Sequence, residues 1–199
     1  MFKKLIRSII EKNSYSDWKK QYHIFRDIDS ENELTRFNSK YLERLLLHAD
    51  SNIPYYNCIF NKIGLIKDDK VDFSRFNSIP ILTKKIIRQY REDMYSRDYF
   101  TRKWYYNSSG GSTGEPVKFI QDDVYRKWGK SVFYYWYKNI LGIEEPEVKK
   151  IILWGSDRNL FRVNSGLRGK INNWLSNTVF LNSFMMSKAD INRYIKLIN

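Results

Sequence analysis

The segment "NSSGGSTGEPVKF", residues 107–119, holds three of the chain's nine glycines within five consecutive positions. Aromatic and β-branched residues flank it, in "KWYY" at 103–106 and "VKFI" at 117–120. This composition predicts two short strands, 103–107 and 117–121, joined by a loop of small residues. Glycines in such a loop let the backbone approach a ligand closely.

The loop itself favours anion binding. Successive backbone N–H groups can form a concavity for an anion, and Ser and Thr hydroxyls add donors. Residues 110–114 also satisfy Gly-x-Ser-x-Gly, the nucleophile elbow of hydrolases, but both histidines, His23 and His48, lie upstream of the serine. The Walker and dinucleotide-binding glycine spacings are absent. The residues therefore favour a phosphate-binding loop, with a plain hairpin connection as the alternative.

Hydrophobic periodicity and capping residues predict helices before the loop. Residues 38–50 open with the capping residues Asn38 and Ser39 and then place apolar residues on one helical face. Residues 79–94 are predicted to be extended through a proline and then helical, with Thr83 as the cap. The region 1–100 is accordingly predicted to be a mainly helical segment of the domain.

The region 101–199 is predicted to be the α/β part that carries the loop. After the loop we expect a helix at 122–142, buried strands at 148–155 and 178–184, and a helix at 187–199 that opens with a capping box of Ser187 and Asp190. The helical face with Trp128, Tyr135 and Trp136 is interpreted as core. This order predicts an α/β fold with an incomplete, mixed or mostly parallel sheet and flanking helices.

Composition limits the function classes. The 199 residues suit one domain with or without a small appendage, and 42% hydrophobic residues allow a packed core. The 35 basic and 22 acidic residues give a net charge of +13, which favours phosphates, nucleic acid or an anionic membrane as partners. Because the basic residues are spread along the chain, a generally basic protein is the alternative.

Cysteine and histidine usage argues against disulfides and His-based metal clusters. Cys58 is the single cysteine, which indicates a reducing compartment, and we expect a cytoplasmic protein. No CxxC or HExxH motif is present, so no protein metal site is expected. The N-terminal "MFKKLIRSIIEK" has apolar residues at helical spacing; packing on its own domain is the favoured interpretation and contact with a membrane surface the less favoured one.

The stretch "SSGGSTGEP" resembles the phosphate-binding signature of adenylate-forming enzymes, the superfamily of acyl-CoA synthetases. The resemblance is closest to the phenylacetate–CoA ligase branch and, within it, to capsular polysaccharide biosynthesis proteins of the CapK type. It extends to "LLLHADSNIPYYNCIFNKIG" at 45–64, "IPILTKKIIRQ" at 79–89 and "IILWGSDRNLF" at 151–161. Together these segments cover residues 40–161.

The resemblance implies the large N-terminal domain of an AMP-forming ligase. In that family a carboxylate attacks the α-phosphate of ATP, with magnesium, and coenzyme A is the usual second substrate. The residues that would hold the β- and γ-phosphates are Ser109, Gly110, Gly111, Ser112, Thr113 and Gly114. Trp154, Gly155 and Ser156 are the candidate substrate crevice, because they close a predicted strand where α/β sheets often bind ligands; ordinary packing of the tryptophan is the favoured alternative.

This sequence also departs from the family. Gly110 stands where many members have Ser or Thr, and Val117 replaces the lysine that often follows the proline, with Lys118 one position later. The family's adenine and ribose motifs, its hinge and its catalytic lysine are not found, so catalytic residues stay unassigned. We expect an N-terminal part that is inactive alone, exposes apolar surface near residues 151–153 and pairs with a complementing C-terminal polypeptide.

Two other interpretations stay open. The chain is alternatively a non-catalytic remnant or subunit with the same fold. A basic nucleic-acid-binding module is the alternative from another class, which the charge and the aromatic content allow. No RNP-type, KH-type or zinc-finger pattern supports it, so nucleic acid is not the expected partner.

Overall fold

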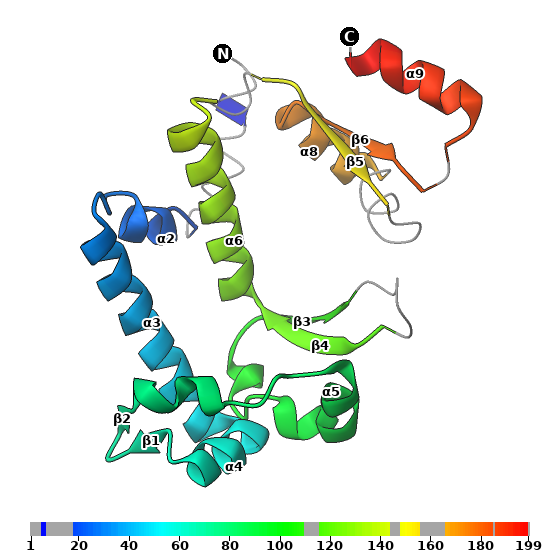
Figure 1. Cartoon of the computed structure of the whole chain (residues 1–199). Coiled ribbons are helices and arrows are strands. Elements are labelled where there is room, and N and C mark those ends of the chain that lie inside the picture. Colours follow the sequence, from blue (N-terminus) through cyan, green and yellow to red (C-terminus); the bar gives the residue numbers. More distant parts are fainter. Residues whose placement is uncertain are drawn as a thin grey trace. The chain divides into compact units, whose positions relative to one another are not determined.

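The computed structural model describes residues 5–6, 18–109, 116–143, 148–155, 166–184 and 186–198. The chain divides into two compact units, each described by itself: unit 1 is Met1–His23 with Lys130–Asn199, and unit 2 is Ile24–Gly129. Helices and short strands alternate in both units (Figure 1). The mixed α/β class that the sequence predicts is therefore confirmed.

Unit 2 is built on the long helix α3, Glu31–Asn52. Its N-cap is Ser30, whose Oγ accepts a hydrogen bond from the Glu33 N–H at 3.2 Å. The predicted start at Asn38 and Ser39 is wrong, because Ser30 satisfies the first free N–H groups and two acidic residues in the first turn favour a helix from there. Ser30 and Glu33 also have the Ser-x-x-Glu spacing of a capping box.

A single non-helical residue, Ile53, separates α3 from α4, Pro54–Ile63. Proline suits the first helical turn because its missing N–H would have no partner there, so Pro54 starts a helix as well as ending one. Gly64 ends α4 with φ 64°, a left-handed conformation that favours glycine. The antiparallel hairpin of β1, Ile66–Lys67, and β2, Lys70–Val71, follows directly.

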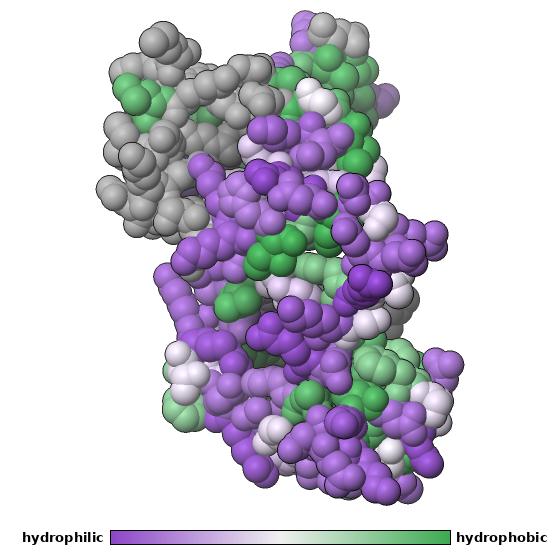
Figure 2. Space-filling model, turned by 90° about the vertical axis from the view of Figure 1, so that its left-hand side faces the viewer, coloured by the Kyte–Doolittle hydropathy of each residue, from purple (hydrophilic) through white to green (hydrophobic). Residues whose placement is uncertain are grey.

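The core of unit 2 lies where α3, α4 and this hairpin meet. Its buried residues are Leu46, Ala49, Phe60 and Leu65, of which Leu65 is fully buried. Partly buried hydrophobic residues pack around them, including Leu42 and others from α4, β1 and β2. On the side of the protein drawn in Figure 2, hydrophilic residues cover much of the described surface and hydrophobic residues appear in separate patches.

Short helices connect this core to the second hairpin of unit 2. Thr83 caps α5, with its Oγ1 accepting from the Ile86 N–H at 3.3 Å, as the sequence predicts. The connecting elements are η1 Phe73–Ser78, α5 Lys84–Tyr90, η2 Arg91–Met94 and η3 Tyr99–Thr101. The second hairpin comprises β3, Trp104–Ser108, and β4, Lys118–Asp122, which confirms both predicted strands with a shift of one residue.

Helix α6, Asp123–Tyr135, follows β4 and continues as the π-helix η4, Trp136–Ile140. The helix predicted at 122–142 is thus confirmed. Its C-terminal half belongs to unit 1 and packs against α2, Trp18–Phe25, where the Ser131 Oγ donates to the Trp18 carbonyl at 2.6 Å. The predicted core position of Trp136 is wrong, since this side chain is 52% exposed.

Unit 1 also contains a parallel strand pair and two helices. Strands β5, Lys150–Trp154, and β6, Thr178–Asn182, pair in register from Lys150 opposite Thr178 to Trp154 opposite Asn182. Helices α8, Leu167–Leu175, and α9, Lys188–Ile198, complete the described part. The capping box at the start of α9 is confirmed: Asp190 N–H donates to Ser187 Oγ at 3.1 Å and Ser187 N–H donates to Asp190 Oδ2 at 3.2 Å.

The sheet differs from the prediction in two respects. The described residues form three separate two-stranded sheets, of which only β5–β6 is parallel. The predicted burial of the 148–155 strand is wrong at its end, because Leu153 is 53% and Trp154 49% exposed. A parallel strand is buried on both faces only where helices cover both faces of the sheet, and Leu153 and Trp154 lack that cover in the described residues.

Helix α3 offers a matched test of the unit 2 core. Leu46 is 6% exposed in the core, whereas its neighbour Leu45 is 62% exposed. Leu46→Ala should lower the free energy of unfolding by about 2–5 kcal/mol, because it leaves a cavity among packed side chains. Leu45→Ala should change it by less than about 0.5 kcal/mol. Urea unfolding followed by circular dichroism measures both, and equal losses would contradict the proposed core.

Candidate functional site

The hairpin β3–β4 brings the residues flanking the Ser/Gly loop together. The pairs Tyr105–Gln121 and Asn107–Phe119 lie on one face. The alternating residues lie on the other face, as the pairs Trp104–Asp122, Tyr106–Ile120 and Ser108–Lys118. Lys118 is therefore on the face opposite to Val117, as strand alternation predicts.

Two hydrogen bonds close the hairpin at the base of the loop. The Ser109 N–H donates to the Val117 carbonyl at 2.9 Å, and the Val117 N–H donates to the Ser109 Oγ at 3.0 Å. Val117 is only 4% exposed, so this pair anchors the start and end of the loop on a packed residue. Ser109 belongs to the predicted phosphate-binding set, and its hydroxyl here accepts a structural hydrogen bond while it still has its own proton to donate.

The rest of the predicted phosphate site lies outside the described residues, which omit 110–115. The predicted phosphate-binding residues that lie there are Gly110, Gly111, Ser112, Thr113 and Gly114. The described part thus positions the two ends of the loop. The phosphate-binding role of its residues stays a prediction.

Polar side chains hold the two strands in register. Tyr105 Oη and Asn107 Nδ2 both donate to Gln121 Oε1, at 3.2 and 2.8 Å. The Arg126 guanidinium lies 5.4 Å from the centre of the Tyr105 ring, which links the first turn of α6 to this face. These contacts come from β3, β4 and α6, so the hairpin is tied to the helix that follows it.

The start of α6 lies at the end of the hairpin away from the loop. Asp122 Oδ1 accepts from the Tyr125 N–H at 2.9 Å, which confirms Asp122 as a capping residue, and the Asp123 N–H donates to the Lys103 carbonyl at 2.8 Å. Five residues of β4 separate this helix start from the loop, a length of about 17 Å at strand spacing. The helix dipole therefore does not act on the loop, and an anion there depends on the loop's own donors.

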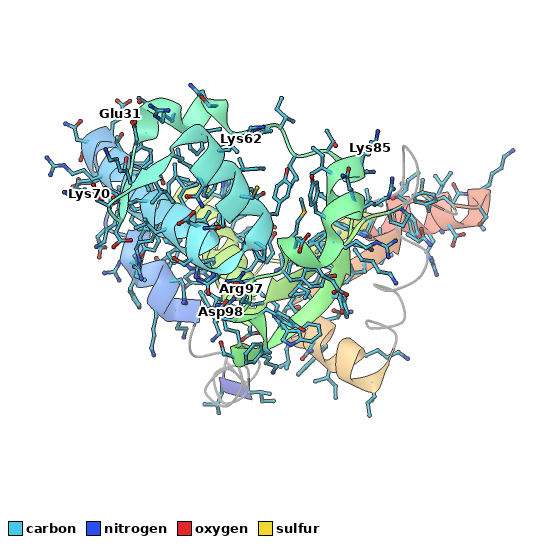
Figure 3. The ribbon with its side chains drawn as sticks, turned by 90° about the horizontal axis from the view of Figure 1, so that it is seen from below. Glu31, Lys62, Lys70, Lys85, Arg97 and Asp98 are labelled. Carbon is cyan, nitrogen blue, oxygen red and sulfur yellow. The ribbon has the colours of Figure 1, made fainter. Side chains whose placement is uncertain are left out.

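A chain of ion pairs and hydrogen bonds runs from His48 through Asp98 and Arg102 to Asp122, at the end of the β3–β4 hairpin. Arg102 donates to Asp98 at 2.7 and 3.0 Å, and its Nε lies 3.1 Å from Asp122 Oδ2. Ser96 Oγ donates to Asp98 and lies 3.1 Å from His48 Nε2. Figure 3 labels Asp98 beside Arg97, whose N–H donates to the Asn52 carbonyl at the end of α3 at 2.9 Å.

His48, which contacts this ion-pair network, has a partner at each of its ring nitrogens. Asn52 Nδ2 lies 3.3 Å from His48 Nδ1, and Ser96 Oγ lies 3.1 Å from His48 Nε2. Since the Ser96 proton goes to Asp98, a neutral ring with its proton on Nε2 satisfies every contact. Ser96 therefore does not give its proton to His48, and the arrangement lacks the serine–histidine geometry of a nucleophilic triad.

Hydrogen bonds keep two carboxylates next to the hairpin, those of Asp98 and Asp123, in the ionised form. The hydrogen bond from Ser96, together with Arg102, keeps the pKa of Asp98 below its usual value of 3.8. The hydrogen bond from Arg126 lowers the pKa of Asp123 in the same way. Both groups are ionised at neutral pH, which suits structural ion pairs and not proton transfer.

The predicted substrate crevice is partly described, in unit 1. Trp154, at the end of β5, is 49% exposed, and its carbonyl accepts from the Ser183 N–H at 3.1 Å. A Cβ on Gly155 would lie 2.8 Å from the Phe184 ring, so glycine lets these two segments approach closely. Ser156 lies outside the described residues.

The sequence analysis did not predict the ion pairs that connect Asp98, Arg102 and Asp122. The Asp98–Arg102 pair at i, i+4 was a visible signal, but Arg102 bridges to Asp122 only through the fold.

Among the described residues, no group of three or more His, Cys, Asp or Glu side chains is arranged to hold a metal ion. None of the helices in the described part is long and apolar enough to cross a membrane.

Comparison with known proteins leaves the family open. No protein-family model matches the chain, and a search of curated proteins finds no match.

The loop closure can be tested with neighbouring serines. Ser109→Ala removes the acceptor of the buried Val117 N–H, so the free energy of unfolding should fall by about 1–3 kcal/mol and the Val117 amide should exchange faster. Ser108→Ala, at an exposed position on the opposite face, should leave both nearly unchanged. Hydrogen exchange and urea unfolding measure the effects; matching behaviour of the two variants would argue against the closure.

The Asp98 ion pair predicts an acid-dependent stability. Because its pKa is lowered in the folded state, Asp98 stabilises the fold above its usual value of 3.8, and this contribution is lost as pH falls through the lowered pKa. Asp98→Asn should therefore reduce the melting temperature at neutral pH and weaken its fall on acidification. The control is Asp93→Asn, at an exposed carboxylate of η2. Identical pH profiles for the wild type and Asp98→Asn would refute the assignment.

Proposed function

We propose that this chain is the N-terminal part of an AMP-forming, carboxylate-activating ligase of the phenylacetate–CoA ligase type. The observation that carries the proposal is a Ser/Gly-rich loop whose ends are held together at the tip of an antiparallel hairpin. The resemblance of "SSGGSTGEP" and three further segments to that family agrees with it. A hairpin that fixes both ends of a loop lets its N–H groups be arranged before the ligand binds.

In the proposed reaction a carboxylate oxygen attacks the α-phosphorus of ATP, and the bond to the β,γ-pyrophosphate breaks. The products are an acyl-adenylate and pyrophosphate. The loop donors at 109–114 would hold the β- and γ-phosphates as negative charge develops on the leaving group. Ser112 and Thr113 supply the hydroxyls, and the glycines allow close backbone approach. Magnesium, bound with the nucleotide, would supply further charge neutralisation.

The donor set fits a phosphate but supports only weak binding by itself. A few charge-assisted hydrogen bonds of roughly 1.5–3 kcal/mol each must offset an association cost of at least about 4 kcal/mol. The helix dipole of α6 adds nothing, because that helix begins at the other end of β4. Adenine, ribose and lysine contacts of the family would come from segments not identified in this sequence.

Several finer assignments belong to the same proposal. Coenzyme A or another acceptor would take the acyl group, and a complementing polypeptide would supply the missing contacts. Capsular or surface polysaccharide biosynthesis is the process suggested by the CapK resemblance. A cytoplasmic location agrees with the single, unpaired Cys58. A non-catalytic subunit with the same fold is the competing form of this proposal, and the exchange assay below separates the two.

Titration calorimetry with magnesium-ATP tests the loop directly. The wild-type chain should bind weakly, and a Ser112→Ala/Thr113→Ala variant should lose most of that affinity because two hydroxyl donors are removed. Ser108→Ala, outside the predicted donor set, is the control. Absence of any nucleotide binding, or equal affinity of the double variant, would contradict the phosphate-loop assignment.

Pyrophosphate exchange across a panel of carboxylic acids tests catalysis separately. The 199-residue chain should show no exchange, because the loop supplies only part of the transition-state stabilisation. Exchange restored by adding a complementing polypeptide would support the ligase over the non-catalytic subunit. Robust exchange by the chain alone would overturn its proposed incompleteness.

A further inference from the structure

The positive charge of the chain is concentrated in unit 1. By sequence, residues 1–23 and 130–199 contain 17 basic and 7 acidic residues, a net of +10. Unit 2, residues 24–129, contains 18 basic and 15 acidic residues, a net of +3. In unit 2 the lysines are also spread out: Figure 3 shows Lys62, Lys70 and Lys85 on α4, β2 and α5. A polyanionic partner is therefore attracted mainly to unit 1.

Few negative charges oppose this field in the described part of unit 1. There the single acidic residue is Asp190, which accepts hydrogen bonds from Ser187 and Arg193. The other six acidic residues of the unit lie outside the described residues and are already subtracted in the net charge.

One side of the helix formed by α6 and η4 is apolar and exposed in unit 1. Val132, Phe133, Trp136 and Ile140 are 48%, 68%, 52% and 57% exposed, respectively. Their spacing of i, i+1, i+4 and i+8 places them along one side of the helix. We call these four residues the α6 stripe. Trp and Phe in such a stripe suit the boundary between lipid headgroups and acyl chains.

The opposite side of the same helix is fixed against α2. Ser131 is fully buried and donates to the Trp18 carbonyl at 2.6 Å, and the Tyr134 ring lies edge-on to the Trp18 ring at 4.9 Å. Beside the stripe, on η4, Asn139 Oδ1 accepts a hydrogen bond from Tyr22 Oη at 3.2 Å. The helix cannot rotate to bury the stripe without breaking these contacts.

Lysines surround the aromatic side of this helix pair. Lys130 and Lys19 lie 4.7 and 5.9 Å from the Trp18 ring centre. Lys138 lies 5.8 Å from the Tyr134 ring centre, and Lys150 lies 5.4 Å from that of Tyr137. Trp18 and Tyr134 belong to the packed side of the helix, so these cations contribute to the positive field of unit 1 as a whole.

We propose that unit 1 binds an anionic lipid surface peripherally through the α6 stripe. The stripe would enter the headgroup boundary to a depth of about 5–10 Å, while the net positive charge of unit 1 attracts the lipid phosphates. The N-terminal sequence "MFKKLIRSIIEK" belongs to the same unit and also combines basic residues with apolar ones at helical spacing. Within it, Leu5 is 60% exposed.

Charge and side-chain type favour lipid over the other occupants of such a face. A second copy of the chain would bring two units of net charge +10 together, which opposes association. A single-stranded nucleic acid would stack its bases on aromatic rings, but Val132 and Ile140, half of the stripe, offer none. Aliphatic side chains gain free energy by entering the acyl region.

Vesicle flotation of the full chain tests the proposal. The chain should float with vesicles containing about 30% phosphatidylglycerol in phosphatidylcholine and bind far less to pure phosphatidylcholine. Raising the salt from about 0.1 to about 0.5 M should weaken the binding, because screening acts on the lysine–headgroup attraction. Phe133→Ser/Trp136→Ser should reduce partitioning by about tenfold or more.

The matched control removes two exposed apolar side chains from unit 2. Ile81→Ser/Phe100→Ser acts at positions that are 86% and 70% exposed and should leave partitioning unchanged. Circular dichroism spectra establish that both variants keep the wild-type fold. Equal loss in the two double variants, or equal binding to neutral and anionic vesicles, would overturn the proposal. So would oligonucleotide binding without vesicle binding, or a stripe variant that changes only the oligomeric state.

Discussion

The guanidinium of Arg102 joins two carboxylates that lie on different segments of unit 2. Asp98 follows the segment held by the end of α3, and Asp122 ends β4 and caps α6. Its two terminal nitrogens donate to Asp98, while its Nε lies 3.1 Å from Asp122 Oδ2 as an ion pair without a hydrogen bond. Arg102 is thus one of the side chains that connect the hairpin with the Ser/Gly loop to the preceding segment of unit 2.

The same arrangement explains what the candidate site can and cannot do. The hairpin is closed at Ser109 and Val117, cross-linked at Gln121 and anchored through Asp122. All of these groups stabilise the frame, and the lowered pKa of Asp98 keeps it ionised in its ion pair. The frame therefore fixes the two ends of the loop, and the ionised carboxylates in it are suited to ion pairs and not to proton transfer.

The two units differ in net charge more than in their exposure of hydrophobic residues. Unit 2 buries Leu46, Phe60 and Leu65 among α3, α4 and a short hairpin. Both units leave large apolar side chains exposed, such as Ile81 in unit 2 and Phe133 and Trp136 in unit 1, but only unit 1 has a net charge of +10. Its positive charge keeps like units apart while attracting anionic partners, so exposed apolar surface and charge act together in the proposed lipid contact.

Local sequence patterns determined the elements wherever nearby residues set the physics. Thr83 capped α5, Ser187 and Asp190 formed the capping box of α9, and strands appeared on both sides of the Ser/Gly loop, because each depends on residues a few positions apart. The start of α3 was missed at Ser30 although its capping signal was local.

Only the tertiary structure determined which distant side chains are partners, which helix faces are buried and how the strands pair. Arg102 forms ion pairs with Asp122 as well as with its neighbour Asp98, and the Ser109 hydroxyl accepts a hydrogen bond from Val117, because folding brings these separate segments together. The apolar periodicity around Trp136 predicted core, yet Ser131 and Tyr134 took the packed side against Trp18. Periodicity shows that a helix has an apolar side, but only the packing of neighbouring elements decides which side is covered.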